Sequence, residues 1–260
     1  NLLRRNRVFN KEFFFIYQLE SREFRLQQSR EHLEQIRNRH KGQRGFIIAN
    51  GPSLRTDDLE LLRNEITIAS NKIHLAFDDT TWRPHYFTVT DELVWNTLTP
   101  EIQKNYDRIY MLDNLDNRRA TVVTTGVRQL SPRYDATESL RLPFSSDLRF
   151  GAFSGNSVTY FNLQLAWFLG LNPVYLLGLD HKYSEKKSFS MTIRHENQSN
   201  HFHANYRQPG EKVRASQSAK IGRFYSMAKA FSQANDWSIV NVSRESHTDV
   251  FEKRSLADII

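Results

Sequence analysis

The residues best suited to chemistry in this sequence stand directly after short apolar runs. The clearest case is Asn50-Gly-Pro-Ser53, which follows the apolar residues 46–49. A run with no polar residue on either face is typical of a strand covered on both sides, as in parallel sheets. At the carboxyl end of such a strand, exposed backbone N–H groups can hold a phosphate. The corner therefore predicts a ligand site, while its alternative interpretation is an ordinary turn.

Polar residues also follow three later apolar runs. These residues are Asn71, Asp91, and Asp180 with His181. In a doubly wound sheet the carboxyl ends of the strands meet at one edge, where ligands bind. Each residue has a simpler role open to it, since Asn71 and Asp91 would equally cap the segments that follow them. Their coincidence at one predicted edge is what favours a site.

A second corner, Ser154-Gly155-Asn156, leads into a predicted helix over residues 157–169. The first N–H groups of a helix have no partner within the helix, so small residues before it can bring a phosphate close. An ordinary helix cap is the alternative.

A polar stretch over residues 195–206 contains His201 and His203 and has neither helix nor strand period. Loops of this length in a compact domain are often lids, and histidine exchanges protons near neutral pH. The stretch therefore predicts a lid with a general base, against the alternative of a solvated loop with incidental histidines.

The elements that must position these residues alternate along the chain. Apolar runs predict strands at 46–49, 66–70, 86–90, 108–112, 174–178 and 237–241, and helices over 56–62, 157–169 and 216–234. Strands that alternate with helices indicate an α/β fold with a doubly wound, mostly parallel, Rossmann-like sheet.

Residues 1–44 form a separate, basic extension to the predicted domain at 45–260. This extension holds eleven Lys and Arg against five Asp and Glu, so most of the net charge of +7 belongs to it. A long amphipathic helix over residues 11–39 is predicted to pack on the main or a neighbouring domain, with peripheral membrane contact as the alternative. No nucleic-acid module is recognisable, so we expect no nucleic-acid partner.

Several classes of function are made improbable by composition. The chain has no cysteine, so it has no disulfide and no thiol nucleophile. The nine histidines show no metal-binding spacing, and we expect no bound metal. There is no apolar run of transmembrane length and no signal peptide, and the first residue is Asn1, so we expect a piece of a longer, cytoplasmic protein.

Four motifs together resemble a known superfamily. They are Asn-Gly-Pro-Ser-Leu at 50–54, Ser-Asn-Lys at 70–72, the small-residue corner at 154–156, and Tyr-Leu-Leu-Gly-Leu-Asp-His at 175–181. One branch of that superfamily is the bacterial sialyltransferases, which use CMP-sialic acid on surface glycans. The other includes archaeal 6-hydroxymethylpterin pyrophosphokinase and flagellar glycosylation accessory proteins. The resemblance covers roughly residues 45–250.

The resemblance to the sialyltransferase branch implies roles for individual residues, which join those that topology alone places at the strand ends, namely Pro52, Asp91, Asp180 and His181. The expected nucleotide and substrate contacts are Asn50, Gly51, Pro52, Ser53, Asn71, Asp91, Ser154, Gly155, Asn156, His181, Tyr183 and Tyr206. Within this set Asn156 departs from the apolar residue usual in the branch, and the two tyrosines would donate to the departing phosphate. The expected catalytic residues are His203 as the preferred base, His201 as the second, and Asp180.

The function implied is a glycosyltransferase that moves an acidic sugar, of the sialic acid or Kdo type, from a CMP-activated donor to a glycan acceptor. The setting would be bacterial surface polysaccharide synthesis at the inner face of the membrane, and the enzyme could be a homo-oligomer. Such a transfer needs a base and hydrogen-bond donors but no cofactor. The alternatives are a Mg²⁺-dependent pyrophosphokinase, with Asp91 and Asp180 as candidate ligands, and a non-catalytic accessory domain.

Overall fold

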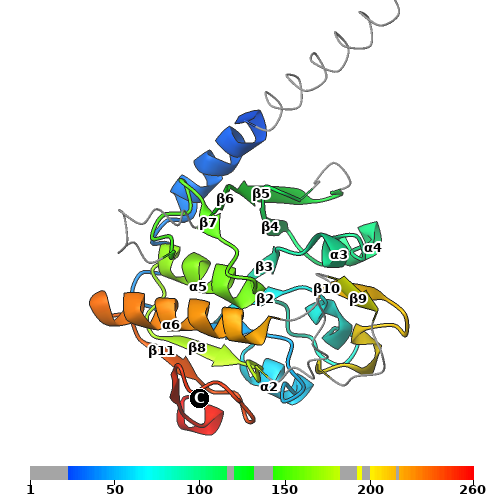
Figure 1. Cartoon of the computed structure of the whole chain (residues 1–260), viewed down its shortest axis with the longest axis vertical. Coiled ribbons are helices and arrows are strands. Elements are labelled where there is room, and N and C mark those ends of the chain that lie inside the picture. Colours follow the sequence, from blue (N-terminus) through cyan, green and yellow to red (C-terminus); the bar gives the residue numbers. More distant parts are fainter. Residues whose placement is uncertain (1–22, 116–119, 132–142, 182–191, 195–199, 215–216) are drawn as a thin grey trace, which may run out of the picture.

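The chain is described by a computed structural model over residues 23–115, 120–131, 143–181, 192–194, 200–214 and 217–260 (Figure 1). Tyr183, which is expected to contact the donor phosphate, lies outside these residues.

One parallel sheet of eight strands organises the molecule (Figure 1). From edge to edge its strands are β12 (Glu252–Lys253), β11 (Ile239–Asn241), β8 (Val174–Leu177), β1 (Gly45–Ile48), β2 (Ile66–Ser70), β3 (Tyr86–Val89), β4 (Arg108–Leu112) and β5 (Val123–Val127). The chain builds outward from β1 to β5 and then returns to the other side of β1. The sheet order therefore reverses between β1 and β8, and this is the topological switch point of the fold.

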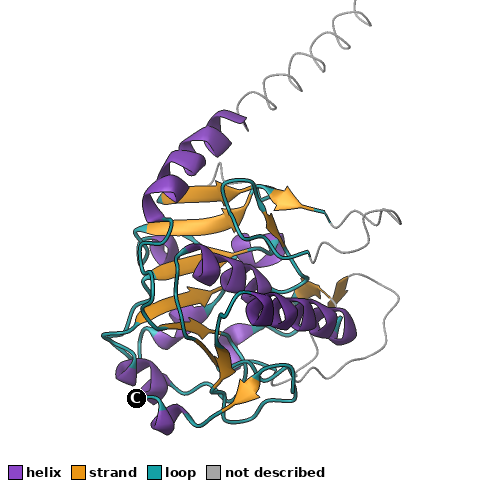
Figure 2. Ribbon diagram, turned by 90° about the vertical axis from the view of Figure 1, so that its left-hand side faces the viewer, coloured by secondary structure: helices purple, strands orange, loops and turns teal. Residues whose placement is uncertain are grey.

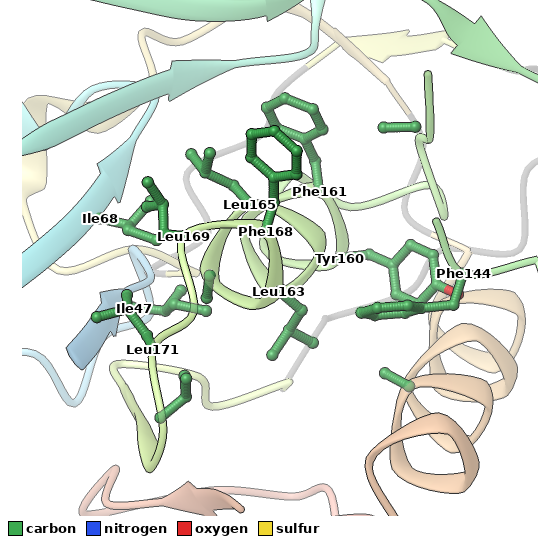
Figure 3. Close-up of a cluster of buried hydrophobic side chains, with 14 of the residues drawn as sticks. Ile47, Ile68, Phe144, Tyr160, Phe161, Leu163, Leu165, Phe168, Leu169 and Leu171 are labelled. Atoms are coloured by element: carbon green, nitrogen blue, oxygen red, sulfur yellow. The ribbon is translucent and has the colours of Figure 1, made fainter. Parts of the chain in front are cut away.

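Helices lie on both faces of this sheet (Figure 2). The helices are α2 (Thr56–Leu61), α3 (Glu92–Trp95), α4 (Pro100–Gln103), α5 (Val158–Phe168) and α6 (Ser218–Ala234), with short 3₁₀ turns η1 (Ile73–Ala76), η3 (Ala204–Tyr206) and η4 (Leu256–Asp258). Strand β1 shows why both faces need cover: Ile47 belongs to the core on the α5 and α6 side, and its neighbours Phe46 and Ile48 belong to the core on the other side. Figure 3 shows how the side chains of α5 fill the first of these cores.

The N-terminal helix, described over residues 23–36, packs against the same domain. Its Leu33 and Ile36 are each 1% exposed and lie in one core cluster with Ile47 and Leu163. This is the packing role that the sequence favours for the extension. No helix in the described part of the chain is both long and apolar enough to cross a membrane.

The predicted fold class is confirmed, and most predicted strands lie within a residue of their observed bounds. The exception among them is β11, which begins at Ile239 rather than at residue 237. The sequence did not indicate β5, because Thr124, Thr125 and Gly126 interrupt its apolar pattern. It also missed two small sheets, β6 (Gln129–Leu130) with β7 (Ala152–Phe153), and β9 (Thr192–Arg194) with β10 (Lys212–Arg214).

Candidate functional site

The Asn50 corner lies at the switch point, as its sequence predicts. Asn50 is 8% exposed, and its Nδ2 donates to the carbonyl oxygen of Ser70 at 3.2 Å. Its Oδ1 is buried and has no hydrogen-bond partner among the described residues. Since a buried acceptor without a partner costs roughly 1–3 kcal/mol, this oxygen is ready to accept a hydrogen bond from a ligand.

The other residues of the corner are held by Asp180. Its carboxylate accepts hydrogen bonds from the backbone N–H of Ser53 at 2.6 Å and from the Ser53 hydroxyl. Burial raises the pKa of Asp180, and the Ser53 bonds counteract this. A Cβ on Gly51 would lie 2.5 Å from the carbonyl oxygen of Gly178 and 2.7 Å from the Asp180 carboxylate, so only glycine fits. Asp180 thus positions the corner. Pro52 lies between Gly51, whose N–H donates to the Gly178 carbonyl oxygen, and Ser53, which Asp180 holds.

Asn71 follows β2 and lies beside Asn50. Its φ of 59° is in the left-handed region, where asparagine is tolerated better than most residues. A hydrogen bond joins its side chain to the hydroxyl of Tyr206, while its Oδ1 is buried without a partner among the described residues. Asn156 and His181 also have positive φ, at 57° and 52°. Strained backbone at several strand ends of one edge is typical of a functional site.

His74 is a neighbour of this site that the sequence did not single out. Burial, with the Lys72 charge, lowers its pKa to about 4, and it hydrogen-bonds to the Asn71 backbone. Its Nδ1 is buried without a partner in the described part of the chain. The neutral ring adds a third unsatisfied acceptor close to Asn71.

The histidine-rich stretch covers the ends of β1 and β2. The backbone N–H of Phe202 donates to the carbonyl oxygen of Asn50 at 3.1 Å. The ring of His201 stacks on Tyr206 with 3.8 Å between centroids. Tyr206 is 2% exposed, and burial raises its pKa to about 12, so its hydroxyl stays protonated. The described residues 200–206 therefore lie where a lid would lie.

Lys72 fastens this stretch to β2. Its Nζ donates to the carbonyl oxygen of Tyr206 at 2.8 Å and pairs with Glu211 at 3.2 Å. Desolvation by burial lowers the pKa of Lys72, while Glu211 counteracts that. Glu211 also pairs with Arg207 at 2.8 Å. Glu211 was not indicated by the sequence, because no local pattern marks a partner 139 residues away.

His203 begins η3 as its N-cap. Its Nδ1 accepts a hydrogen bond from the backbone N–H of Asn205 at 3.1 Å. A neutral imidazole that accepts at Nδ1 carries its proton at Nε2. In this conformation His203 therefore presents a hydrogen-bond donor to a ligand.

The second corner lies at the N-terminus of α5. The other end of α5 leads to Leu171, which lies against Gly45 at the amino end of β1, so the helix begins at the carboxyl edge of the sheet. Gly155 has φ of 56°, and a Cβ there would lie 2.2 Å from the Tyr160 ring. The exposed Asn156 side chain donates to Gln217 at 3.3 Å, next to the start of α6. Ser154 completes this corner, which precedes the first N–H groups of α5.

The capping role of Asp91, which was the simpler alternative, is what the structure shows. Its Oδ1 accepts from the backbone N–H of Leu93 at 2.9 Å and from Arg214 Nε at 3.1 Å. Both candidate magnesium ligands, Asp91 and Asp180, are thus engaged by protein groups. Among the described residues there is no group of three or more His, Asp or Glu that could hold a metal ion.

These features define a Rossmann-like α/β protein with a candidate ligand site at the carboxyl ends of β1 and β2, which residues 200–206 cover. The chain belongs to the MptE-like family: the family model described as 6-hydroxymethylpterin diphosphokinase MptE-like matches residues 23–186. This confirms the superfamily that the four motifs resemble, and the match includes the described N-terminal helix.

A solved structure shares the fold. The MAf glycosyltransferase from Magnetospirillum magneticum AMB-1 matches with a TM-score of 0.51 and 14% identity over 84% of this chain. The chain spans 35% of the length of that protein. A search of curated proteins gave no match.

Proposed function

We propose that this chain is the donor-binding and catalytic domain of a glycosyltransferase that uses a CMP-activated acidic sugar. The acceptor would be a glycan in bacterial surface polysaccharide synthesis. The observation that carries the proposal is the pair of buried, unsatisfied amide oxygens of Asn50 and Asn71 at the switch point. The likeness in fold to the MAf glycosyltransferase supports it.

The two amide oxygens favour a particular kind of nucleobase. Because Nδ2 of Asn50 donates to Ser70, its Oδ1 can only accept, and Asn71 Oδ1 can only accept as well. An exocyclic amine, which cytosine and adenine carry and uracil lacks, would satisfy such acceptors. A cytidine nucleotide therefore fits this site better than a uridine nucleotide.

The phosphate of the donor would lie at the corner of Ser154 to Asn156. The first N–H groups of α5 point toward this corner, and the helix dipole favours an anion there. Hydrogen-bond donors aimed at a leaving phosphate stabilise the charge that develops as the sugar departs. Arg214, which is 49% exposed beside Asp91, would bind the carboxylate of an acidic sugar.

The proton chemistry would belong to the lid. His203 presents a donor in the observed conformation, which suits the leaving phosphate better than the acceptor hydroxyl. We therefore assign the general base to His201 and the donor role to His203. Tyr206, protonated and next to Asn71, would orient the base and its donor.

A Mg²⁺-dependent pyrophosphokinase is the second candidate, because the family model is named for that activity. Adenine would satisfy the same two oxygens. This reaction would require Asp91 and Asp180 to exchange their present hydrogen bonds for a metal ion.

The first test is thermal unfolding of the chain with CMP, UMP or ATP, each with and without Mg²⁺. A ligand at about 100 times its dissociation constant adds roughly 2.7 kcal/mol, which raises Tm by roughly 5 °C or more. We expect a shift with CMP that needs no Mg²⁺ and no shift with UMP. An increase in Tm only with ATP and Mg²⁺ would favour the pyrophosphokinase. An unchanged Tm with every ligand would favour an accessory domain.

A variant tests whether the increase in Tm with CMP arises from binding at Asn71. Asn71→Gly removes the amide and keeps the left-handed backbone, since glycine adopts positive φ freely. We expect it to abolish the CMP shift. Asn38→Gly is the matched control, because Asn38 has φ of 56° but lies after the N-terminal helix; it should keep the full shift.

A further inference from the structure

A cavity lies away from the proposed nucleotide site, between the N-terminal helix and the edge of the sheet. It has a volume of about 380 Å³, within the range of small-ligand pockets. The helix contributes Arg25, Gln28 and His32, and strands β4 and β5 contribute Arg108 and Thr124 among others. We call this cavity the edge groove.

The edge groove is built from residues that suit sugars and anions. Arg108 Nη1 donates to Thr125 Oγ1 at 2.9 Å. Within the described residues neither Arg108 nor the exposed Arg25 forms an ion pair with a carboxylate. Gln28 adds an amide group, which can hydrogen-bond to sugar hydroxyls.

The charge of the groove is graded along β4. Arg108 begins the strand and Asp113 follows its end, so the two are about 16 Å apart at roughly 3.3 Å per residue. Asp113 accepts a hydrogen bond from the Gln129 backbone N–H at 2.8 Å. Burial and the Arg108 charge hold His32 neutral, with a pKa of about 4. Near Arg108 the groove is therefore positive.

The groove continues the edge that carries the nucleotide site. Its Asp113 end is at the carboxyl end of β4, three strands from β1. At about 4.8 Å per strand this end of the groove is roughly 14 Å from the Asn50 corner, and Arg108 lies at the other end of β4, about 16 Å along the strand. An extended molecule could thus reach from the nucleotide site into the groove.

We propose that the edge groove binds an acidic oligosaccharide, held by Arg25 and Arg108, as the acceptor of the transfer. This inference rests on the proposed function and adds the chemistry of the acceptor to it. A guanidinium without a carboxylate partner binds a sugar carboxylate through two parallel hydrogen bonds.

The test is titration of the whole chain with a sialic acid tetramer and with maltotetraose, a neutral oligosaccharide of equal length. We expect the acidic tetramer to bind about tenfold more tightly or better, and added salt to weaken it. Equal binding of the two oligosaccharides, or no binding of either, would overturn the inference.

Variants locate the binding. Arg25→Gln with Arg108→Gln should weaken binding of the acidic tetramer about tenfold or more. Arg63→Gln, an exposed arginine on the other face of the molecule paired with Glu60, is the control and should leave it unchanged. If the double variant does not fold, Arg25→Gln alone serves, since its side chain is exposed. Unchanged binding in a folded variant refutes the groove.

The CMP shift separates this inference from the proposed function. If CMP raises Tm but the acidic tetramer does not bind, the acceptor groove is refuted and the proposed glycosyltransferase stands. If the tetramer binds through the two arginines but CMP does not raise Tm, the groove stands as a site for acidic glycans and the proposed CMP-sugar donor is refuted.

Discussion

At the scale of single residues, the site is defined by the atoms that folding leaves without a partner. Asn50 and Asn71 each use their Nδ2 within the protein and keep a buried Oδ1 unsatisfied. Asp180 is the opposite case, because both of its oxygens are used to hold Ser53. Residue type alone makes all three candidates for the site, and only their hydrogen bonds separate residues with a free acceptor from a residue that positions the corner.

The two lid histidines are predicted to differ in their effect on the pH–rate profile. His201→Ala should lower kcat for CMP-sialic acid by about 10²-fold or more and remove the loss of activity at low pH, since a base must be deprotonated to act. His203→Ala should lower kcat and keep that loss. The measurement is kcat against pH for both variants. If the acid limb disappears in His203→Ala and persists in His201→Ala, the roles are reversed.

At the scale of elements, the segment over residues 202–211 is held against the sheet by an ion pair and hydrogen bonds. Lys72, at the end of β2, holds the Tyr206 carbonyl and Glu211, while Phe202 is bonded to the end of β1. The two strands that carry the amide oxygens therefore also carry the lid. Binding at the strand ends and closure of the lid should be coupled through these contacts.

Lys72→Met is predicted to loosen the lid. The change removes an ion pair and a charged hydrogen bond and leaves Glu211 with one cation, which costs about 2 kcal/mol of lid docking. Amide hydrogen exchange at Phe202 and Tyr206 should then become roughly 30-fold faster. Lys104→Met, at an exposed lysine after α4, is the control. Equal exchange in both variants would show that Lys72 does not fasten the lid.

At the scale of the whole molecule, two half-buried histidines join the N-terminal helix and the turn after it to the sheet. His32 Nε2 lies 3.0 Å from the Tyr110 hydroxyl and His40 Nε2 lies 2.7 Å from the Tyr86 hydroxyl. Burial lowers the pKa of both histidines, that of His32 to about 4. The helix is thus docked partly through groups that must stay uncharged.

Stability is therefore predicted to fall as pH decreases from about 6.5 toward 4. In this window the unfolded chain takes up protons on histidines whose folded pKa is depressed, so protonation favours unfolding. The measurement is the free energy of unfolding against pH in urea. His32→Gln should reduce the slope by removing one such group. A slope that is unchanged in this variant would show that His32 is not among the groups responsible.

The sequence by itself determined the sheet and the polar residues that stand at its carboxyl edge. Apolar runs such as residues 46–49 are too short for a buried helix and end at turn residues, which indicates buried strands, and the polar residues after them mark the carboxyl edge. These are local signals. For the same reason β5 was missed: its residues 124–126 carry no apolar pattern, and only pairing with β4 makes them a strand.

The tertiary structure alone decided what the site residues do. The bonds of Asp180 to Ser53 and of Lys72 to Glu211 join residues 127 and 139 positions apart. Such contacts depend on which strands become neighbours and how the chain returns over them, and no short pattern encodes that choice. The edge groove is likewise a product of packing, since it exists only where the N-terminal helix crosses the open edge of the sheet.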